Sequence, residues 1–295
     1  MSRIPVFTDD PGWHGKRLQE AFAMRGVEAV FISLKQCHLD LTASGSGVVI
    51  PGFSSLPKFA FVRGVPGGTL QQVIARLDIL HALEMLGVKV YNTGRAVERT
   101  VDKAMTSFLL HQHGVASPDT WVCESRHFAE HVLMQETADG SALVLKPLFG
   151  SQGNGVRLIK RGESLPVPML HYVDGLYYLQ RYVDSGEGQW HDHRVFVIQG
   201  KAVAAMVRHG ASWVNNVALG GRCESIPLKG ELIAMAEAAS KAVGIDYCGV
   251  DVICDQAGKA YVLEVNSIPA WKGLQGVVNL DIAQALVDDC LKDLT

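Results

Sequence analysis

Apolar positions in the first third of the chain form short runs separated by helical stripes. Runs at 4–8, 27–32, 48–50, 59–62 and 89–91 predict strands. Helices are predicted near 16–24 and from Leu70 to Leu83, where apolar residues recur every three or four positions. The opening strand–helix–strand order is typical of a βαβ unit. Residues 1–92 are therefore predicted to form an α/β lobe, and it contains no phosphate-binding loop.

The rest of the chain alternates β-hairpins with amphipathic helices. Asp102 is placed to cap a helix ending near 113, and Ser125 to cap one that reaches about 137. Further helices are predicted at 232–243, before Gly244, and at 282–290. Strands are predicted at 120–122, 143–145, 156–160, 177–183, 193–198, 202–208, 247–254 and 260–265. This order indicates a mixed α/β (α+β) protein.

The hairpin at 143–160 joins a buried strand, a lysine and a loop of small residues. The strand ends at Lys146, and the loop that follows contains Gly150, Ser151, Gln152, Gly153 and Gly155. Glycines let successive N–H groups turn toward one anion. The loop lacks the Lys-Ser/Thr pair of a Walker motif and the third glycine and helix of a dinucleotide fingerprint. It predicts a lid over a nucleotide phosphate, or an ordinary surface hairpin.

The hairpin at 247–265 carries acidic residues. Glu264 and Asn266 are two apart on one strand and share a face, and Asp251 lies on the preceding strand. Two carboxylates about 4 Å apart repel by ~4 kcal/mol at an effective dielectric near 20, and a divalent cation removes that cost. Oxygen ligands of this kind favour Mg²⁺ or Mn²⁺. The alternative is a solvent-facing polar side of an edge hairpin.

Two arginines stand beside predicted strands. Arg208 ends one, where it could neutralise a transferring phosphoryl group. Arg63 follows another, where its planar fork could reach a substrate carboxylate; a solvated surface arginine is the alternative. The strand at 177–183 offers a backbone edge for adenine, with Asp192 or Asp184 on the ribose.

Composition narrows the class of protein. A formal net charge of −3 predicts no general affinity for nucleic acid. No apolar run approaches the ~20 residues of a membrane span, and the first residues lack the apolar region of a signal peptide. The six cysteines are scattered and form no CxxC pair. These features predict a cytoplasmic protein that does not bind membranes. A homo-oligomer is compatible with the sequence.

Several motifs together resemble one family. DK near 102, LVLKPLFGSQGNGV, YLQRYV, DHRVFVIQGKAVAAMVR, NNVALGG, GVDVI and LEVNSIP occur in the order typical of the ATP-grasp superfamily. They are most similar to the RimK-type α-L-glutamate ligases. The resemblance implies an N-terminal pre-ATP-grasp domain at 1–92, a central lobe with the lid at 93–178, and a C-terminal lobe with the metal site at 179–295.

The resemblance also implies roles for individual residues. Lys103 and Lys146 would bind the phosphates of ATP under the 150–155 lid. Asp192 would meet the ribose, and Arg208 and Asn216 would face the γ-phosphate and the acyl phosphate. The adenine would be lined by Gln180, Arg181, Tyr182 and Val183. Two Mg²⁺ ions, or Mn²⁺, would be held by Asp251, Glu264 and Asn266.

The activity implied is ATP-dependent amide formation through an acyl phosphate. L-Glutamate would be added to a small-molecule carboxylate acceptor, such as a pterin-type or furan-type one-carbon cofactor. The alternatives are a ligase acting on a peptide or protein C-terminus, a non-catalytic ATP-binding regulator, and a structural protein. The sequence departs from the family pattern at Arg181, Val214, Leu219 and Ala270. Val214 and Leu219 stand where arginines are common, which bears on glutamate recognition.

Overall fold

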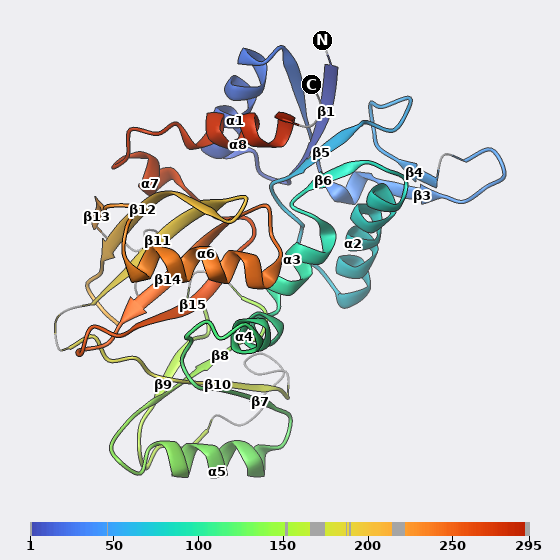
Figure 1. Ribbon diagram of the computed structural model, residues 1–295. Helices are drawn as coiled ribbons and strands as arrows, with labels where there is room; N and C mark the ends of the chain where they lie inside the picture. Colours follow the sequence, from blue (N-terminus) through green and yellow to red (C-terminus); the bar gives the residue numbers. More distant parts are fainter. Residues whose placement is uncertain are drawn as a thin grey trace.

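The computed structural model describes residues 2–45, 47–150, 153–165, 175–186, 188, 190–213 and 222–292. Three larger sheets follow one another along the length of the molecule (Figure 1), and a fourth, two-stranded sheet belongs to the N-terminal lobe. The predictions made for Ser151, Gln152 and Asn216, and the departures at Val214 and Leu219, lie outside the described residues.

The N-terminal sheet is parallel and has the strand order β2-β1-β5-β6. Its strands are β1 (Ser2–Phe7), β2 (Val27–Ile32), β5 (Phe59–Val62) and β6 (Lys89–Tyr91). The helices α1 (Gly12–Met24) and α2 (Leu70–Met85) connect them, and Thr69 caps α2 through a capping box with Gln72. The short elements η1 (Leu34–Gln36), β3 (His38–Asp40) and β4 (Gly47–Val49) precede β5. The strand order reverses direction between β1 and β5, which makes this pair the topological switch point.

The central sheet is antiparallel and has the order β7-β10-β8-β9. Its strands are β7 (Thr120–Cys123), β8 (Leu143–Lys146), β9 (Arg157–Ile159) and β10 (Tyr177–Arg181), and it packs on α5 (Arg126–Glu136). As predicted, Ser125 caps α5 by accepting from Phe128 N at 3.2 Å. The buried residues of this sheet and of α5 form a hydrophobic cluster of their own.

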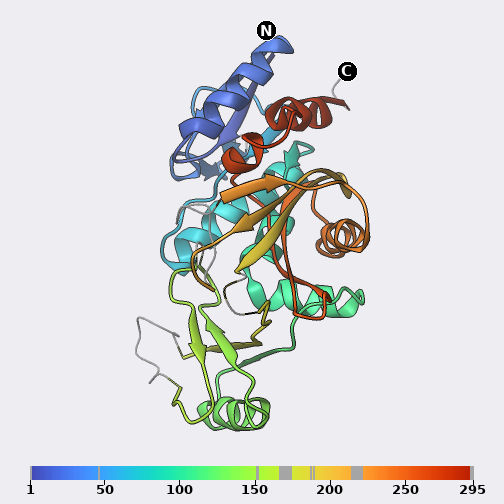
Figure 2. The ribbon, with the colours of Figure 1, turned by 90° about the vertical axis from the view of Figure 1, so that its left-hand side faces the viewer.

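The third sheet has five strands in the order β13-β12-β11-β14-β15. These are β11 (His191–Ile198), β12 (Lys201–His209), β13 (Arg222–Ser225), β14 (Tyr247–Cys254) and β15 (Ala260–Asn266). One face is apolar and is covered by α6 (Glu231–Val243), which lies on the outside of the sheet in Figure 2. Before β7 the chain forms α3 (Gly94–Val101) and α4 (Lys103–Gln112), and after β15 it forms α7 (Lys272–Gln275) and α8 (Ile282–Leu291).

The other face of this sheet changes character along its strands. Phe196, Met206 and Tyr247 pack into a cluster with residues of β1, α1, β5 and α8. Farther along the same strands, Arg194, Arg208 and Asp251 occupy that face, because side chains two residues apart in a strand point the same way. The apolar half thus docks on the N-terminal lobe, and the polar half faces the central sheet.

Asn92 ties the N-terminal lobe to the five-stranded sheet. Its side chain is fully buried at the end of β6. Its Oδ1 accepts from Asp246 N at 3.0 Å and from Tyr247 N at 2.9 Å. Its Nδ2 donates to the carbonyl oxygens of Tyr247 and Ser267, both at 2.8 Å. One side chain therefore holds β6, β14 and the end of β15 together.

Most predicted elements are confirmed, several with their bounds. β2, β5 and β6 span the predicted residues, and Asp102 caps α4 by accepting from Ala104 N and Met105 N. α3 and β13 were not predicted. α3 is only eight residues long and has few apolar residues to mark its buried face, and β13 is a four-residue edge strand with three exposed positions. The domain bounds at 92 and 178 stay predictions, and the second lies inside β10.

Candidate active site

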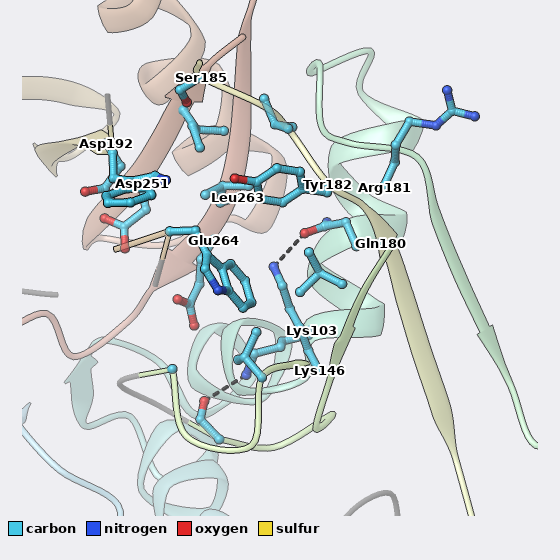
Figure 3. A pocket seen from close by; sticks show the side chains of 18 of the residues that line it. Lys103, Lys146, Gln180, Arg181, Tyr182, Ser185, Asp192, Asp251, Leu263 and Glu264 are labelled. Carbon is cyan, nitrogen blue, oxygen red and sulfur yellow. Dashed lines mark hydrogen bonds between the residues drawn. The ribbon is translucent and has the colours of Figure 1, made fainter. Parts of the chain in front are cut away.

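A pocket of about 200 Å³ lies between the central and the five-stranded sheets (Figure 3). Its walls come from β8, β10 and the loop after β8 on one side, and from β11, β12, β14 and β15 on the other. The predicted site residues that line it are Lys103, Lys146, Gly150, Gly153, Gln180, Arg181, Tyr182, Val183, Asp192, Arg208, Asp251 and Glu264. Gly155, Asn266 and Arg63 are not part of its lining.

Lys146, the last residue of β8, has a neutral partner. Its Nζ donates to Gln180 Oε1 at 2.6 Å, and Gln180 Nε2 donates to Thr120 Oγ1 at 3.1 Å. Burial lowers the pKa of Lys146 to about 8, against the opposing effect of Glu264 and with a smaller contribution from Lys103. A half-buried ammonium whose direct partner carries no charge is well suited to an incoming anion.

Lys103 begins α4 and reaches the loop that follows β8. Its Nζ donates to the carbonyl oxygens of Gly150 at 2.8 Å and of Leu148 at 3.4 Å. Burial lowers its pKa, while Glu264 and Asp102 oppose that change. Asp102 itself accepts from two backbone amides at the start of α4, which fixes the position from which Lys103 projects. Two lysines from separate elements therefore enter one pocket.

The acidic residues come from the hairpin of β14 and β15. Its register pairs Asp251 with Glu264 and Gly249 with Asn266, so the three predicted metal ligands share one face. Glu264 lines the pocket and makes no hydrogen bond or ion pair within the described part of the chain. Asn266 Nδ2 donates to the Gly249 carbonyl at 3.4 Å. The amide oxygen of Asn266 is thus left to act as a ligand.

Asp251 is held by two arginines. Arg194 donates to it through Nε and, at 2.6 Å, through Nη2, and Arg208 Nη2 lies 3.1 Å from Asp251 Oδ1. Arg208 also pairs with Asp192, and each of these four side chains is at most 12% exposed. Although burial opposes ionisation, Arg194 and Arg208 hold the pKa of Asp251 below its usual range. For Asp192 burial prevails over its arginine partner, and the pKa is raised.

Arg194, which contacts the pocket residue Asp251, was not predicted from the sequence. It lies two residues after Asp192 on β11 and so shares its face, and it is the register partner of Asp251 on β14. The Asp-x-Arg spacing at the start of the strand predicted at 193–198 was the available signal. The aromatic and apolar members of the lining were also missed: Val144, Trp190, Trp213, Ile253 and Leu263.

The predicted adenine wall contributes backbone and side chains differently. The Arg181 side chain points away from the pocket in Figure 3 and pairs with Glu136, with Asp119 Oδ2 at 3.6 Å. Only the backbone of Arg181 is therefore left to border the pocket. The Tyr182 ring lies in the pocket and meets Trp213 edge to face, with the ring centroids 6.0 Å apart.

Arg63 lies at a different place, at the contact between the N-terminal lobe and the chain after β15. Its guanidinium carbon is 4.9 Å from the centre of the Trp271 ring, and its Nη1 donates to the Ile268 carbonyl at 3.3 Å. The alternative of a solvated surface arginine does not fit, because the Nε of Arg63 is shielded from solvent. Its predicted role on a substrate carboxylate stays a prediction.

The ligand set fits oxygen-bound Mg²⁺ better than a transition metal. Two carboxylates and an amide oxygen are hard ligands. Within the described ranges no group of three or more His, Cys, Asp or Glu side chains could hold a metal ion. Over the same residues, no helix is long and apolar enough to cross a membrane.

Comparisons with known proteins cover nearly the whole chain. Residues 3–97 match the RimK PreATP-grasp domain, and residues 100–290 match the RimK-like ATP-grasp domain. A tetrahydromethanopterin:alpha-L-glutamate ligase of Methanococcus maripaludis is 35% identical over 238 residues, 79% of each chain. A probable alpha-L-glutamate ligase of Teredinibacter turnerae is 30% identical over 97% of this chain and 94% of the relative.

A solved structure agrees on the fold. The ATP-grasp ligase PsnB, complexed with minimal precursor, Mg and ADP, superposes with a TM-score of 0.75 over 99% of this chain and 97% of that one. At 19% identity this likeness concerns the fold alone. The predicted ATP-grasp fold with an N-terminal pre-ATP-grasp domain is confirmed.

Proposed function

The chain belongs to the RimK-like ATP-grasp family, and on that premise we propose that it is an ATP-dependent ligase joining L-glutamate to a small-molecule carboxylate acceptor. The observation that supports this most is the pocket in which Lys103 and Lys146 lie opposite the Asp251–Glu264 pair. Cations on one wall and carboxylates on the other suit a triphosphate held together with Mg²⁺.

The reaction proceeds in two steps. A carboxylate oxygen of the acceptor attacks the γ-phosphorus of ATP, the bond to the β-γ bridging oxygen breaks, and ADP leaves. The amine of glutamate then attacks the carbonyl carbon of the acyl phosphate, phosphate leaves, and the nitrogen loses a proton to give the amide. No protein nucleophile takes part, so the protein contributes positioning and neutralisation of charge.

Residues of the pocket divide this work. Lys146 and Lys103 bind phosphate oxygens, and Arg208 neutralises the phosphoryl group in transfer together with Asn216. Gln180, Arg181, Tyr182 and Val183 border the adenine, and Asp192 meets the ribose. The loop of Gly150, Ser151, Gln152, Gly153 and Gly155 covers the phosphates and keeps water from the acyl phosphate.

Asp251, Glu264 and Asn266 would hold Mg²⁺. We propose two ions, which Mn²⁺ can replace, and they supply neutralisation of the phosphate charge. Asp251 is already paired with Arg194 and Arg208. The two guanidiniums keep that carboxylate ionised in a buried setting, which is the protonation state that a metal ligand requires.

The acceptor is a pterin-type or furan-type cofactor. The relative from Methanococcus maripaludis is named for tetrahydromethanopterin, and its similarity supports an acceptor of that chemical class. Cell-extract cofactors incubated with the protein, ATP, Mg²⁺ and glutamate should gain the mass of one or more glutamate residues. If a peptide or a protein C-terminus gains this mass instead, the protein is the alternative ligase that acts on those acceptors.

Removal of the Glu264 carboxylate tests the active site. Glu264→Ala should lower acceptor-dependent phosphate release by about 10²-fold or more, because a metal ligand in the pocket is lost. Glu130→Ala, at a half-exposed position on α5 away from the pocket, is the matched control and should leave the rate unchanged. Equal rates in both variants would refute the role of Glu264, and ATP binding without turnover in the wild type would indicate a regulator.

A further inference from the structure

The N-terminal lobe has an edge at which parallel sheets commonly bind ligands. Ligands of open α/β sheets lie outside the carboxyl ends of the strands at the switch point. In this sheet that place is the end of β1 and β5, after Phe7 and Val62. Arg63 is the first residue beyond β5, and its N–H donates to the Phe7 carbonyl at 2.9 Å. The backbone of Arg63 therefore lies at the switch point of the sheet.

The Arg63 side chain is half-buried and has no counterion among the described residues. Its guanidinium lies over the Trp271 ring, 4.9 Å from the centroid, and Nη1 has a 3.3 Å contact with the Ile268 carbonyl. No described carboxylate forms an ion pair with it, and its shielded Nε has no hydrogen-bond partner. The Nε1 of fully buried Trp271 also lacks a partner. Buried donors left unpaired in this way are costly, and a charged one most of all.

Three arginines on the two walls of the pocket differ in this respect. Arg194 and Arg208 share Asp251, and Arg181 pairs with Glu136. Each of these has a carboxylate within its reach. Arg63 contacts only a carbonyl oxygen and an aromatic face, neither of which neutralises its charge.

The neighbours of Arg63 do not supply a negative charge either. His14 Nε2 accepts from Trp271 N at 3.1 Å, so this nitrogen is unprotonated. Burial, with Arg63 and Lys272, lowers the pKa of His14 to about 4, against a weaker effect of Asp10, so the ring is neutral at pH 7. Asp10 is exposed and bonds through its backbone to Thr8. The net local charge around the guanidinium is positive.

The chain that encloses Arg63 is continuous with the acidic hairpin. Ile268 and Trp271 follow Asn266 by two and five residues, just after β15 ends. Tyr247, at the start of β14, donates through its hydroxyl to the Val62 carbonyl at 2.8 Å. Both strands that carry the proposed metal ligands therefore run directly into the surroundings of Arg63.

We propose that Arg63 binds a non-reacting carboxylate of one of the two substrates at the switch point of the N-terminal sheet. This rests on the proposed ligase function. A guanidinium fork matches a carboxylate with two parallel hydrogen bonds, and one such charge neutralises a carboxylate but not a phosphate dianion. The carboxylate is either the α-carboxylate of glutamate or a second carboxylate of the acceptor.

Steady-state kinetics of Arg63→Met test the proposal and identify the source. The KM of one substrate should rise about 10- to 100-fold, because a charge-assisted bidentate contact is lost, while the KM for ATP stays within about twofold. A rise for glutamate assigns the α-carboxylate, and a rise for the acceptor assigns the acceptor. Arg63→Lys should recover part of the loss. Arg3→Met is the control, since Arg3 lies at the amino end of β1 in the same sheet and pairs with Glu28.

A second measurement separates this site from the ligase assignment. Tryptophan fluorescence is titrated with L-glutamate and with glutarate in the presence of ADP and Mg²⁺, since Trp271 adjoins the guanidinium. Saturable change in the wild type and in Arg3→Met, lost in Arg63→Met, supports the site even if no amide is formed. Folded Arg63→Met with unchanged KM values for both substrates overturns the proposal. If the wild type forms no amide, an Arg63→Met titration curve that matches the wild-type curve overturns the proposal.

Discussion

The two walls of the pocket treat their buried charges in opposite ways. On the central sheet, Lys146 bonds to a neutral amide, and burial lowers its pKa to about 8. On the five-stranded sheet, Asp251 is surrounded by two guanidiniums, and its pKa is held low. On the acidic wall Asp251 and Asp192 are neutralised by arginines of the same sheet, whereas the ammonium of Lys146 has a neutral partner and would gain a counter-charge only from an anion.

The largest expected effect concerns the acidic wall. Arg194→Met should lower the free energy of unfolding by about 3 kcal/mol or more, because the buried carboxylate of Asp251 loses the guanidinium that donates two hydrogen bonds to it. Arg126→Met, which breaks the exposed pair with Glu130 on α5, should cost less than about 1 kcal/mol. Denaturant unfolding of both variants measures the difference.

A double variant sharpens this result. Arg194→Met combined with Asp251→Asn removes both charges, so its loss should be smaller than the sum of the two single losses. If the losses simply add, or if Arg194→Met and Arg126→Met lower the free energy of unfolding equally, Asp251 does not depend on its arginine partners. The contrast between the two walls of the pocket would then be wrong.

The second prediction concerns the pH dependence of ATP binding by the lysine wall. Phosphate favours the protonated form of Lys146, whose pKa in the free protein is about 8. Below pH 8 the ammonium is already present, and above it each binding event must take up a proton. Affinity for ATP should therefore fall by up to about tenfold per pH unit above 8.

Calorimetry in two buffers of different ionisation enthalpy measures the proton uptake directly. Lys146→Met should bind ATP more weakly, and its ATP affinity should vary less with pH. Any pH dependence that remains is assigned to Lys103. Affinity of the wild type that stays constant between pH 7 and 9.5 would show that Lys146 is not the group that meets the phosphate.

The smallest effect concerns the neutral partner of Lys146. Gln180 Oε1 accepts from the ammonium at 2.6 Å and so favours the charged form. In Gln180→Leu, ATP affinity should begin to fall at a lower pH than in the wild type. At pH 6 the ATP affinity of the variant should differ from that of the wild type by only about threefold. Gln135→Leu, at an exposed position on α5, serves as the control. An unchanged onset would mean that Gln180 does not set the pKa of Lys146.

Much of the fold was predictable because local signals agree with the final structure. The caps at Asp102 and Ser125 depend on three or four consecutive residues. The Gln199-Gly200 turn between β11 and β12 has positive φ at both residues, and a dipeptide ending in glycine between two predicted strands is a local signal for such a turn. The two hairpins that carry Lys146 and the Asp251–Glu264 pair were identified for the same reason.

The charge network could not be predicted, because it depends on long-range register. Arg194 meets Asp251 only because β11 pairs with β14, and these strands are more than fifty residues apart in the chain. A bulge between Asp251 and Val252 further adjusts the register on β15. The sequence indicated which residue types were present near the site, but not which arginine would neutralise which carboxylate.

The single core shared by the N-terminal lobe and the five-stranded sheet decides how the pocket can open. Phe61, Tyr247 and Trp271 belong to one cluster, and Asn92 locks the same junction. The central sheet, with its separate cluster under α5, is the natural moving part. If the central sheet moves as a unit, the lysine wall moves with it, while Arg63 and the acidic hairpin, which lie on the other side of the pocket, keep their spacing.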